Sequence, residues 1–335
     1  MSAVQEAAPG IYKIVQSVSR FKFSLNIYVI AGENGLVFDS GFGLRKMGRA
    51  LVEQIREIEA LERAKGLPCR ITRVMASHGH WDHFSGLAFL QEALGLDVLA
   101  TDKQAGRFTS KSDYKHFFWE EQALFDADLD PGHHSRKNPW RRMRNAAVNE
   151  LLIRLCRIRF VSGDVVPVRE GQVLSVGPAS WEIIPVPGHC DDDIALFNRR
   201  TGVLLGGDLV LRKITTWLGP TKSDLDLYLN SLERVGQLPG LKLILPAHGS
   251  PITDPKGRIR KAIAHRHHRI DQIRNSIEEA GNLSFDEIYR RFYPKNALQR
   301  SLLGGWIVIT LRYLLDRGEI RVEQKGGKPH FRAAS

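Results

Sequence analysis

Cysteine is scarce in this chain, and long apolar runs are missing from it. Among 335 residues there are three cysteines, Cys69, Cys156 and Cys190, at spacings that suggest no pairs. This scarcity argues against a disulfide framework and favours a reducing compartment. No apolar run approaches the roughly 18–20 residues that a membrane-spanning helix requires, so we expect no membrane association. Residues 1–9 show neither a basic start nor an apolar core, and we therefore expect no secretory signal and a cytoplasmic location.

The composition is otherwise that of an ordinary globular protein, but its positive charge is unevenly distributed. Hydrophobic residues make up 43% of the chain and charged residues 25%, and the length suffices for one large α/β domain and a smaller one. Residues 103–159 hold 12 basic against 7 acidic residues and residues 256–335 hold 17 against 8, so these two segments carry +14, and the rest of the chain carries about −3 of the net charge of +11. This distribution indicates an anionic substrate or partner, or else a surface whose charge only aids solubility.

The densest group of possible metal ligands lies in residues 77–83, Ser-His-Gly-His-Trp-Asp-His. Imidazole nitrogens and carboxylate oxygens are preferred ligands of zinc and similar first-row metals. The preceding residues 70–76 alternate apolar side chains and include β-branched ones, which predicts a strand that ends in a loop. A loop at a strand end can fold its side chains around one point. The segment therefore predicts a metal site that contains His78, His80, Asp82 and His83.

Three later segments repeat the pattern of an apolar β-like run followed by a turn and a ligand residue. These runs, 181–186, 201–205 and 241–245, lead to His189, Asp208 and His248. Each one alone is equally well explained as a strand that ends in a polar turn. In this order behind the first motif, they complete a set of seven candidate ligands, which is enough for two metal ions that share one carboxylate.

The order of these seven residues resembles the ligand set of the metallo-β-lactamase fold superfamily. Residues 1 to about 255 fit the layout of that superfamily, and residues 35–41 are similar to its aspartate-containing turn beneath the metals. The resemblance implies an α/β protein built as an αββα sandwich, in which Asp39 supports the metal site without being a ligand. It also implies a division of the ligands: His78, His80 and His189 for one metal, Asp82, His83 and His248 for the other, and Asp208 as the bridge.

This ligand set determines the expected chemistry. Two divalent cations about 3.5–4 Å apart clamp the attacking and leaving oxygens of a displacement, and they lower the pKa of bound water from about 15.7 to about 7. We therefore expect hydrolysis by a metal-bridging hydroxide, with Asp82 and Asp208 as catalytic carboxylates. Zinc is the first choice for both ions, although ligation without cysteine also suits iron or manganese.

Two other interpretations of the metal site are less favoured. Iron would leave room for a redox role, because the superfamily includes dioxygenases and flavodiiron proteins, but the sequence offers no candidate for a flavin-binding domain. A catalytically inactive binding module is disfavoured because no position of the ligand set is missing.

Residues 102–160 interrupt the β-rich pattern and are predicted to form a helical insertion. Residues 119–127 and 143–156 have helical spacing, and residues 131–139 carry turn signals between them. The insertion resembles those that other superfamily members use to wall the active site. Its aromatic and basic residues either contact an acyl chain or a nucleobase, or pack the insertion onto the core: Tyr114, Phe117, Phe118, Trp119, Lys111, Lys115 and His116.

Residues 256–335 are predicted to begin with a long amphipathic helix. Asp254 is a suitable N-cap, and Pro255 suits the first helical position. Isoleucines then recur at helical spacing from Ile259 to Ile277, which predicts a helix with one apolar face.

Two further helices and a hairpin are predicted to follow and complete a winged-helix-like domain. Ser284 and Glu287 form a capping box, residues 298–316 predict a third helix, and residues 318–332 predict a β-hairpin. The same tail is found in the β-lactamase-like protein 2 group of the superfamily. The third helix is mostly apolar, whereas a helix that recognises bases needs an exposed polar face. We therefore expect the domain to pack on the core or on a partner subunit rather than to bind DNA sequence-specifically.

Two classes of hydrolase fit these observations. The first is an ester or thioester hydrolase that acts on a small anionic carrier such as an acyl-coenzyme A, because the resemblance includes thioesterases and the insertion combines apolar and basic residues. The second is a single-strand RNA endonuclease, since the same two-domain group includes such enzymes and the positive charge suits a phosphodiester backbone. The larger inserted domain of the nuclease relatives is absent from this sequence, which favours the first class. Lactonase and β-lactam hydrolase activities are further alternatives, and a homo-oligomer is left open.

Overall fold

The computed structural model describes residues 4–18, 23–117, 147, 150–151, 153–219, 222–293, 304–326 and 328–334. Within these residues, the strands form sheets of seven, five and three strands. The seven-stranded sheet follows the chain order of β1 (Gln5–Ala8), β2 (Ile11–Val18), β3 (Phe23–Ile30), β4 (Gly35–Phe38), β5 (Ile71–Met75), β6 (Asp97–Ala100) and β7 (Val166–Pro167). The five-stranded sheet has the order β12 (Leu243–Leu245), β11 (Val203–Leu205), β10 (Ile194–Asn198), β9 (Ala179–Pro185) and β8 (Val173–Val176).

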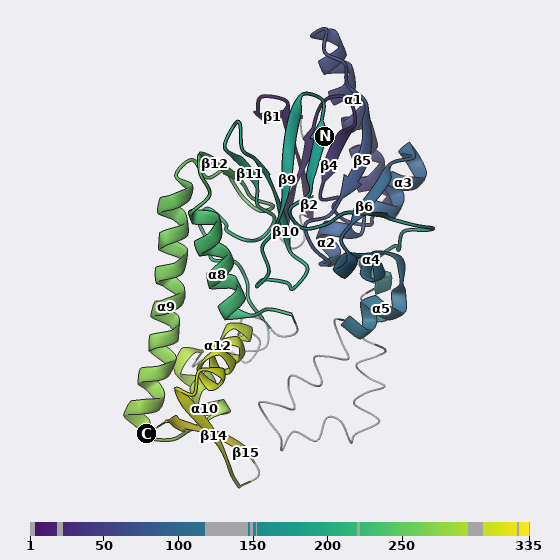
Figure 1. The fold of residues 1–335 in the computed structure, drawn as a ribbon. Coiled ribbons are helices and arrows are strands. Elements are labelled where there is room, and N and C mark those ends of the chain that lie inside the picture. Colours follow the sequence, from purple (N-terminus) through teal and green to yellow (C-terminus); the bar gives the residue numbers. More distant parts are fainter. Residues whose placement is uncertain are drawn as a thin grey trace.

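The two larger sheets pack face to face and are covered on their outer sides by helices (Figure 1). Successive side chains of a strand point to opposite faces, so in β3 Tyr28 and Ile30 enter the core between the sheets, whereas Ile27 and Val29 face the helices. Helices α1 (Arg45–Ala64) and α3 (Leu87–Leu94) cover the seven-stranded sheet, and α8 (Leu225–Gly236) and α9 (Pro255–Ala280) cover the other. This α–β–β–α order confirms the predicted fold class.

The strands that precede the candidate ligands all end at one edge of the sandwich. Strand β5 runs parallel to β4 and β6, and β11 runs parallel to β12. Strand β9 runs in the same direction as β11 because both are antiparallel to β10. Parallel strands end at the same edge of a sheet. The loops that follow β5, β9, β11 and β12 therefore meet, and each of them carries candidate ligands.

Hydrogen bonds across the sandwich fix the two sheets to each other at this edge. The Asn26 side chain donates from Nδ2 to the carbonyl oxygen of Pro246 over 2.9 Å, and the Tyr28 hydroxyl donates to the same oxygen over 2.9 Å. The amide of Ile194 donates to the carbonyl oxygen of Ser77 over 2.9 Å. The ligand loops are thus held by buried polar contacts between the sheets as well as by the apolar core.

The described part of the insertion packs onto the core. Helices α4 (Asp102–Thr109) and α5 (Lys111–Lys115) begin it. The ring of Tyr114 lies 5.3 Å from that of Phe84 and 5.7 Å from that of Phe160, between ring centroids. Tyr114 therefore has the packing role that was one of its two predicted alternatives. Phe118, Trp119, residues 119–127 and the loop 131–139 lie outside the described residues.

The C-terminal elements follow the predicted order of helices and hairpin. They are α9, β13 (Leu283–Ser284), α10 (Phe285–Phe292), α12 (Gly305–Asp316), β14 (Ile320–Lys325) and β15 (Lys328–Ala333), with the sheet order β13-β15-β14. The Asp254 carboxylate caps α9 by accepting from the amide of Gly257 over 3.0 Å, and Ser284 and Glu287 form the predicted capping box of α10. Residues 298–303 of the predicted third helix lie outside the described residues.

One apolar core joins these C-terminal elements to the sandwich. It contains Phe197 and Leu204 of the five-stranded sheet, Ile259 of α9, Ile309 of α12 and Phe331 of β15. The long helix α9 therefore covers the sheet with its first half and carries the C-terminal elements on its second half (Figure 1). In the described part of the chain, none of the helices has the length and apolar character to cross a membrane.

Candidate metal centre

The seven candidate ligands come together at the edge where the ligand loops meet. In the first group, His80 Nδ1 lies 2.7 Å from His78 Nε2 and 2.9 Å from His189 Nε2. One nitrogen from each of the three rings thus faces a common point, with all three atoms within 4.8 Å of one another. His78 and His189 are buried, and His80 is partly exposed on the open side of the group.

The second group contains Asp82, His83 and His248. Asp82 Oδ2 lies 3.5 Å from His83 Nε2 and 3.7 Å from His248 Nε2. Asp82 and His83 lie in the short helix α2 (Trp81–Phe84) that follows β5, where the sequence predicted a loop, and His248 lies in the loop after β12, so each sheet contributes to this group.

Asp208 lies between the two groups. Its Oδ2 is 3.5 Å from His189 Nε2 and 3.8 Å from His83 Nε2, and its Oδ1 is 3.4 Å from His248 Nε2. The two oxygens of one carboxylate therefore face nitrogens of both groups, and the resemblance implies a bridging ligand at this residue.

Four of the imidazole rings are oriented by acceptors at their other nitrogen. His78 Nδ1 lies 3.2 Å from Asp193 Oδ1, and His83 Nδ1 lies 3.1 Å from Asp39 Oδ2. The other two rings use backbone carbonyls: His189 Nδ1 lies 2.7 Å from the oxygen of Trp217, and His248 Nδ1 lies 2.5 Å from that of Ser24. A hydrogen bond from Nδ1–H leaves the lone pair on Nε2 to face the centre, as is usual for histidines that bind metals.

Of these orienting residues, the sequence predicts only Asp39. Asp193 ends the run of three aspartates, residues 191–193, that follows His189 and Cys190. Carboxylates so close to a candidate ligand are a sequence signal for a residue that orients a histidine ring. The carbonyl groups of Trp217 and Ser24 have no signature in the sequence, because every residue carries one.

Two glycines allow the ligand loops to approach their neighbours. A Cβ on Gly188, which has a φ of +137°, would lie 2.2 Å from the Cα of Tyr228 in α8. A Cβ on Gly207, with a φ of +50°, would lie 2.8 Å from the Cβ of Ser77. Glycine is the residue that adopts positive φ without a steric penalty, so these positions let the loops before His189 and Asp208 pass close to the rest of the site.

Burial, more than charge, lowers the pKa of three of the candidate histidine ligands and so favours the neutral imidazole that binds a metal. Burial, together with the neighbouring imidazoles, holds the pKa of His78 and His80 well below the usual value, and burial also lowers the pKa of His189. At His83, burial lowers the pKa, but Asp39 and Asp82 outweigh it and raise the pKa to about 10. Burial raises the pKa of Asp208, but the surrounding histidines outweigh burial and lower it.

The residues of this centre fit divalent cations. His83 Nε2 and Asp208 Oδ1 are buried, and neither atom has a hydrogen-bond partner within the described residues. Buried polar atoms of this kind need a partner, and a cation between the two groups supplies one. The donors are imidazole nitrogens and carboxylate oxygens without cysteine, a set that suits zinc, iron or manganese.

A third cluster of ligand-type residues, Cys190, Asp191 and Asp192, is explained by an ion pair instead. Arg107 Nη1 lies 2.7 Å from Asp192 Oδ2 and 3.0 Å from Asp191 Oδ1, and Arg107 and Asp192 are both buried. The amide of Cys190 donates to Asp193 Oδ2 over 2.7 Å. These contacts fix the loop that carries His189.

The ring of Trp217 lies beside the first group of ligands. Its ring centroid lies 6.5 Å from that of His80 and 6.3 Å from that of His189, and 46% of the residue is exposed. No sequence pattern marks this tryptophan, which lies in an irregular segment between β11 and α8. It places an apolar surface beside the first group of ligands.

Comparisons with known proteins identify the family and the fold of this chain. A family model described as the metallo-beta-lactamase superfamily matches residues 21–248. The protein named "Probable metallo-hydrolase YqjP" from Bacillus subtilis (strain 168) is 25% identical over 280 residues, which cover 80% of this chain and 80% of that protein. An acyl-coenzyme A thioesterase of Gallus gallus is 26% identical over 244 residues, covering 71% of this chain and 77% of that protein. The crystal structure of a beta-lactamase domain protein from Burkholderia ambifaria shares the fold, with a TM-score of 0.76 at 22% identity over 99% of this chain and 93% of that one.

Proposed function

The chain belongs to the metallo-β-lactamase superfamily of metal-dependent hydrolases, and on that premise we propose that it uses two cations to hydrolyse an ester or thioester of a small anionic carrier, such as an acyl-coenzyme A. The observation that carries the dinuclear part of this proposal is the position of Asp208, whose two oxygens face nitrogens of both ligand groups at 3.4–3.8 Å.

The proposal assigns each cation to one group of ligands. His78, His80 and His189 would hold the first cation, Asp82, His83 and His248 the second, and Asp208 would contact both. Bound there, divalent cations polarise the carbonyl group of a substrate and lower the pKa of water from about 15.7 to about 7. Zinc is our first choice for both positions, with iron or manganese as the alternatives.

The protein's own residues would then position water and substrate. Asp82 Oδ2 lies within 3.5–3.7 Å of two histidine nitrogens, where it can accept a hydrogen bond from the attacking water and fix its direction. Asp39 and Asp193 hold the rings of His83 and His78 in place. The apolar ring of Trp217 excludes water from the side of His80 and His189, which strengthens the electrostatic interactions in the site.

Two observations support a thioester or ester of an anionic carrier as the substrate. The Gallus gallus relative named as an acyl-coenzyme A thioesterase aligns with 71% of this chain. The segment 103–159 carries an excess of positive charge, which suits phosphate groups on a carrier.

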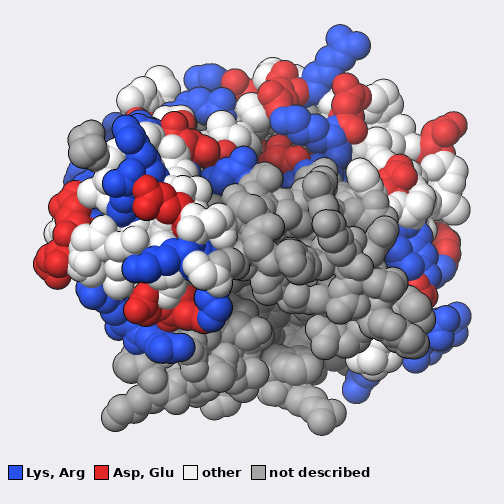
Figure 2. Space-filling view, turned by 90° about the horizontal axis from the view of Figure 1, so that it is seen from below, with Lys and Arg blue, Asp and Glu red and all other residues white. Residues whose placement is uncertain are grey.

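The RNA alternative receives less support from the C-terminal elements. Several of their basic residues are engaged in ion pairs: Arg274 with Glu319, Arg332 with Glu323, and Arg317 with Asp226 of α8. Over the described residues visible in Figure 2, basic and acidic side chains alternate and do not gather into a face of one sign. A nucleic-acid surface is expected to present a continuous basic stripe.

The deciding experiment identifies the bond that breaks. The protein expressed with zinc is incubated with acyl-coenzyme A substrates of several chain lengths and, in parallel, with labelled single-stranded RNA. We expect free thiol from the acyl-coenzyme A, detected with a thiol reagent, and its loss in the Asp208→Ala variant. RNA fragments that disappear with Asp208→Ala, without thiol release at any chain length, would overturn the proposal in favour of a ribonuclease.

A further inference from the structure

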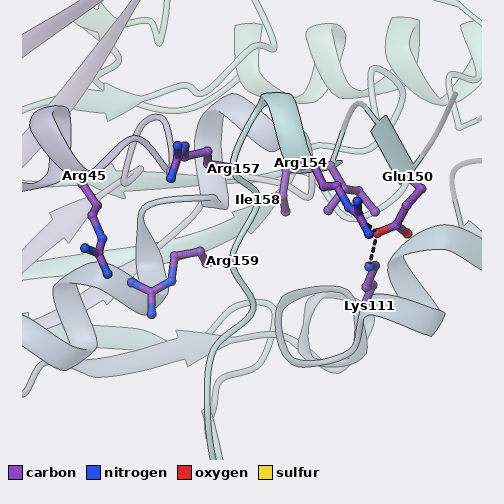
Figure 3. Close-up of a pocket in the computed structure, with 9 residues that line it drawn as sticks. Arg45, Lys111, Glu150, Arg154, Arg157, Ile158 and Arg159 are labelled. Atoms are coloured by element: carbon purple, nitrogen blue, oxygen red, sulfur yellow. Dashed lines mark hydrogen bonds and ion pairs between the residues drawn. The ribbon is translucent and has the colours of Figure 1, made fainter. Parts of the chain in front are cut away.

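A pocket of about 510 Å³ lies at the start of α1, where the insertion returns to the sandwich. Five basic residues line it: Arg45, Lys111, Arg154, Arg157 and Arg159. Figure 3 shows Arg45, Arg157 and Arg159 on one side of this pocket, and Arg154 and Lys111 around Glu150 on the other. We refer to it as the arginine pocket.

Positive charge in the arginine pocket exceeds the negative charge that balances it. Its one acidic lining residue, Glu150, contacts Lys111 Nζ at 2.6 Å, Lys115 Nζ at 2.7 Å and Arg154 Nε at 3.4 Å. Arg159 pairs with Glu92 outside the lining. Within the described residues, Arg45 and Arg157 have no acidic partner. Like charges in one cavity repel each other, so an anion that enters this pocket gains the attraction of at least these two guanidinium groups.

The backbone of Arg157 is held in a conformation that ordinarily belongs to glycine. Its φ is +50°, and it ends a helical segment in which the amide of Ile158 donates to the carbonyl oxygen of Ile153 over 3.0 Å. Helices commonly end with glycine at this left-handed position because glycine has no Cβ. Arginine at this point carries a steric cost that glycine would not, and in return it places a guanidinium group in the pocket.

The pocket shares a loop with the metal centre. A Cβ on Gly43 would lie 2.1 Å from the carbonyl oxygen of Arg157, so the two backbones are in direct contact. The same loop also contacts the segment that carries the candidate ligand His83. The amide of Ser40 donates to the carbonyl oxygen of His83 over 2.8 Å, and the ring centroid of Phe42 lies 5.3 Å from that of Trp81. One side of this loop therefore faces the metal ligands and the other faces the arginine pocket.

The start of α1 adds to the positive potential of the pocket. The helix begins at Arg45, has no acidic residue in its first turn and has no side-chain cap. The amino end of a helix carries a partial positive charge, which adds to that of the guanidinium groups.

We propose that the arginine pocket binds phosphate groups of the carrier whose ester or thioester is hydrolysed at the metal centre, an inference that rests on the proposed function. The ligand class is a small phosphorylated carrier, such as the adenosine bisphosphate end of coenzyme A. Guanidinium groups bind phosphate oxygens through paired, charge-assisted hydrogen bonds. This pocket is separate from the seven metal ligands and contributes affinity rather than chemistry.

Binding is tested first, without any turnover. Adenosine 3′,5′-bisphosphate is titrated into the zinc-loaded full-length chain by calorimetry. We expect binding to weaken about 10-fold in Arg157→Gly and in Arg45→Gln, which corresponds to about 1.4 kcal/mol for each charge-assisted contact. Arg157→Gly also removes the left-handed strain, so its midpoint of thermal unfolding should not fall.

Arg260→Ala is the matched control, because Arg260 is also an exposed arginine on a helix, and α9 lies on the opposite side of the sheets from α1 (Figure 1). Its affinity for the bisphosphate should equal that of the unsubstituted chain. Equal weakening in Arg260→Ala would show that the net charge, and not this pocket, attracts the ligand, and it would overturn the proposal. So would unchanged affinity in Arg157→Gly.

Two further probes show which class of phosphorylated ligand the arginine pocket binds. Inorganic phosphate should compete with the bisphosphate, because both present the same oxygens. Labelled single-stranded RNA should bind no better to the unsubstituted chain than to Arg157→Gly. RNA binding that depends on Arg157, together with no detectable binding of the bisphosphate, would assign the pocket to a polynucleotide and contradict our inference.

Kinetics separate this proposal from the proposed function. Hydrolysis of an acyl-coenzyme A is compared with that of the same acyl group on N-acetylcysteamine, which carries no phosphate. We expect Arg157→Gly to raise KM about 10-fold for the first substrate, with kcat unchanged, and to leave the second unaffected. Bisphosphate binding without hydrolysis of either thioester would refute the proposed function and retain the pocket. Equal hydrolysis of both thioesters without bisphosphate binding would refute the pocket and the anionic carrier, and would retain thioester hydrolysis at the metal centre.

Discussion

The guanidinium group of Arg266 in α9 donates a hydrogen bond from Nη2 to the carbonyl oxygen of Thr216, which lies in the segment after β11. Thr216 in turn donates from Oγ1 to the carbonyl oxygen of Asp208 over 2.8 Å, and the next residue, Trp217, accepts from His189 Nδ1. Arg266 is 6% exposed. A buried arginine that follows all seven candidate ligands in the sequence thus fixes the segment that positions two of them.

We predict that Arg266→Met lowers the free energy of unfolding by about 2 kcal/mol, because it leaves a buried carbonyl group without its donor. It should also weaken zinc binding, since the segment between Asp208 and Trp217 loses its support. Urea unfolding of the metal-free protein and zinc titration measure the two effects. Arg260→Met, an exposed substitution on the same helix, should change neither; equal losses in both variants would show that α9 itself is the cause.

We predict two metal ions per chain after expression with zinc, and a lower metal content in Asp208→Ala. The substitution removes the carboxylate that faces both ligand groups, so hydrolysis should fall by orders of magnitude while circular dichroism shows an intact fold. Elemental analysis provides the count. Asp286→Ala, which removes an exposed carboxylate of α10, is the control. One metal ion or none in the unsubstituted chain would contradict the dinuclear assignment.

The network around Glu62 predicts a pH-dependent contribution to stability. Burial raises the pKa of Glu62, but hydrogen bonds from Lys65, at 2.8 Å, and from Tyr12 outweigh it and hold the pKa below the usual value. A carboxyl group whose pKa is depressed by folding stabilises the protein above its unfolded pKa and loses this contribution as the pH falls through the folded value. Glu62→Gln should therefore be less stable than the unsubstituted chain near pH 7.

The difference in stability between Glu62→Gln and the unsubstituted chain should shrink as the pH falls below about 4.5, the usual pKa of glutamic acid. Thermal unfolding at a series of pH values measures it. A difference that stays constant from pH 7 to pH 3 would mean that the charge of Glu62 does not contribute.

We predict that Gly188→Ala prevents normal folding or lowers the free energy of unfolding by about 4 kcal/mol or more, because its Cβ would lie 2.2 Å from the backbone of Tyr228. Gly240→Ala is the matched control, since Gly240 also has a positive φ, of +73°, but a Cβ there would meet no atom within 4 Å. The control should lose only about 1 kcal/mol, from the strained backbone. Similar losses in both variants, measured by urea unfolding, would show that strain and not close approach is decisive.

Much of the fold follows from local signals in the sequence. The alternation in residues 70–76 predicted the strand β5, although part of the segment behind it forms the short helix α2 and not a loop, and the capping box of Ser284 and Glu287 predicted the start of α10. These signals are local because a strand or a helix start depends on neighbours within about four residues. The two-layer arrangement of the sheets came from the resemblance to a superfamily, since pattern alone does not fix which sheet faces which.

The candidate site was predicted less completely. The structure brings together all seven candidate ligands, and their role as ligands stays a prediction. It also adds contacts that no pattern could supply, such as the carbonyl groups of Ser24 and Trp217 and the ion pair of Arg107 with Asp192. These contacts join residues far apart in the chain through groups that are either present in every residue or common on every surface. Only a three-dimensional arrangement distinguishes them.

The distribution of the ligands over the two sheets has a consequence for the order in which the protein matures. A nascent chain that has been synthesised through β8 carries four of the seven candidate ligands, His78, His80, Asp82 and His83, but neither group is complete. The first group needs His189, and the second needs His248, which follows the last strand of the sandwich. High-affinity cation binding is therefore expected only after both sheets have formed and docked, and a cation that binds the folded state alone then stabilises it, by about 2.7 kcal/mol at a concentration 100 times Kd.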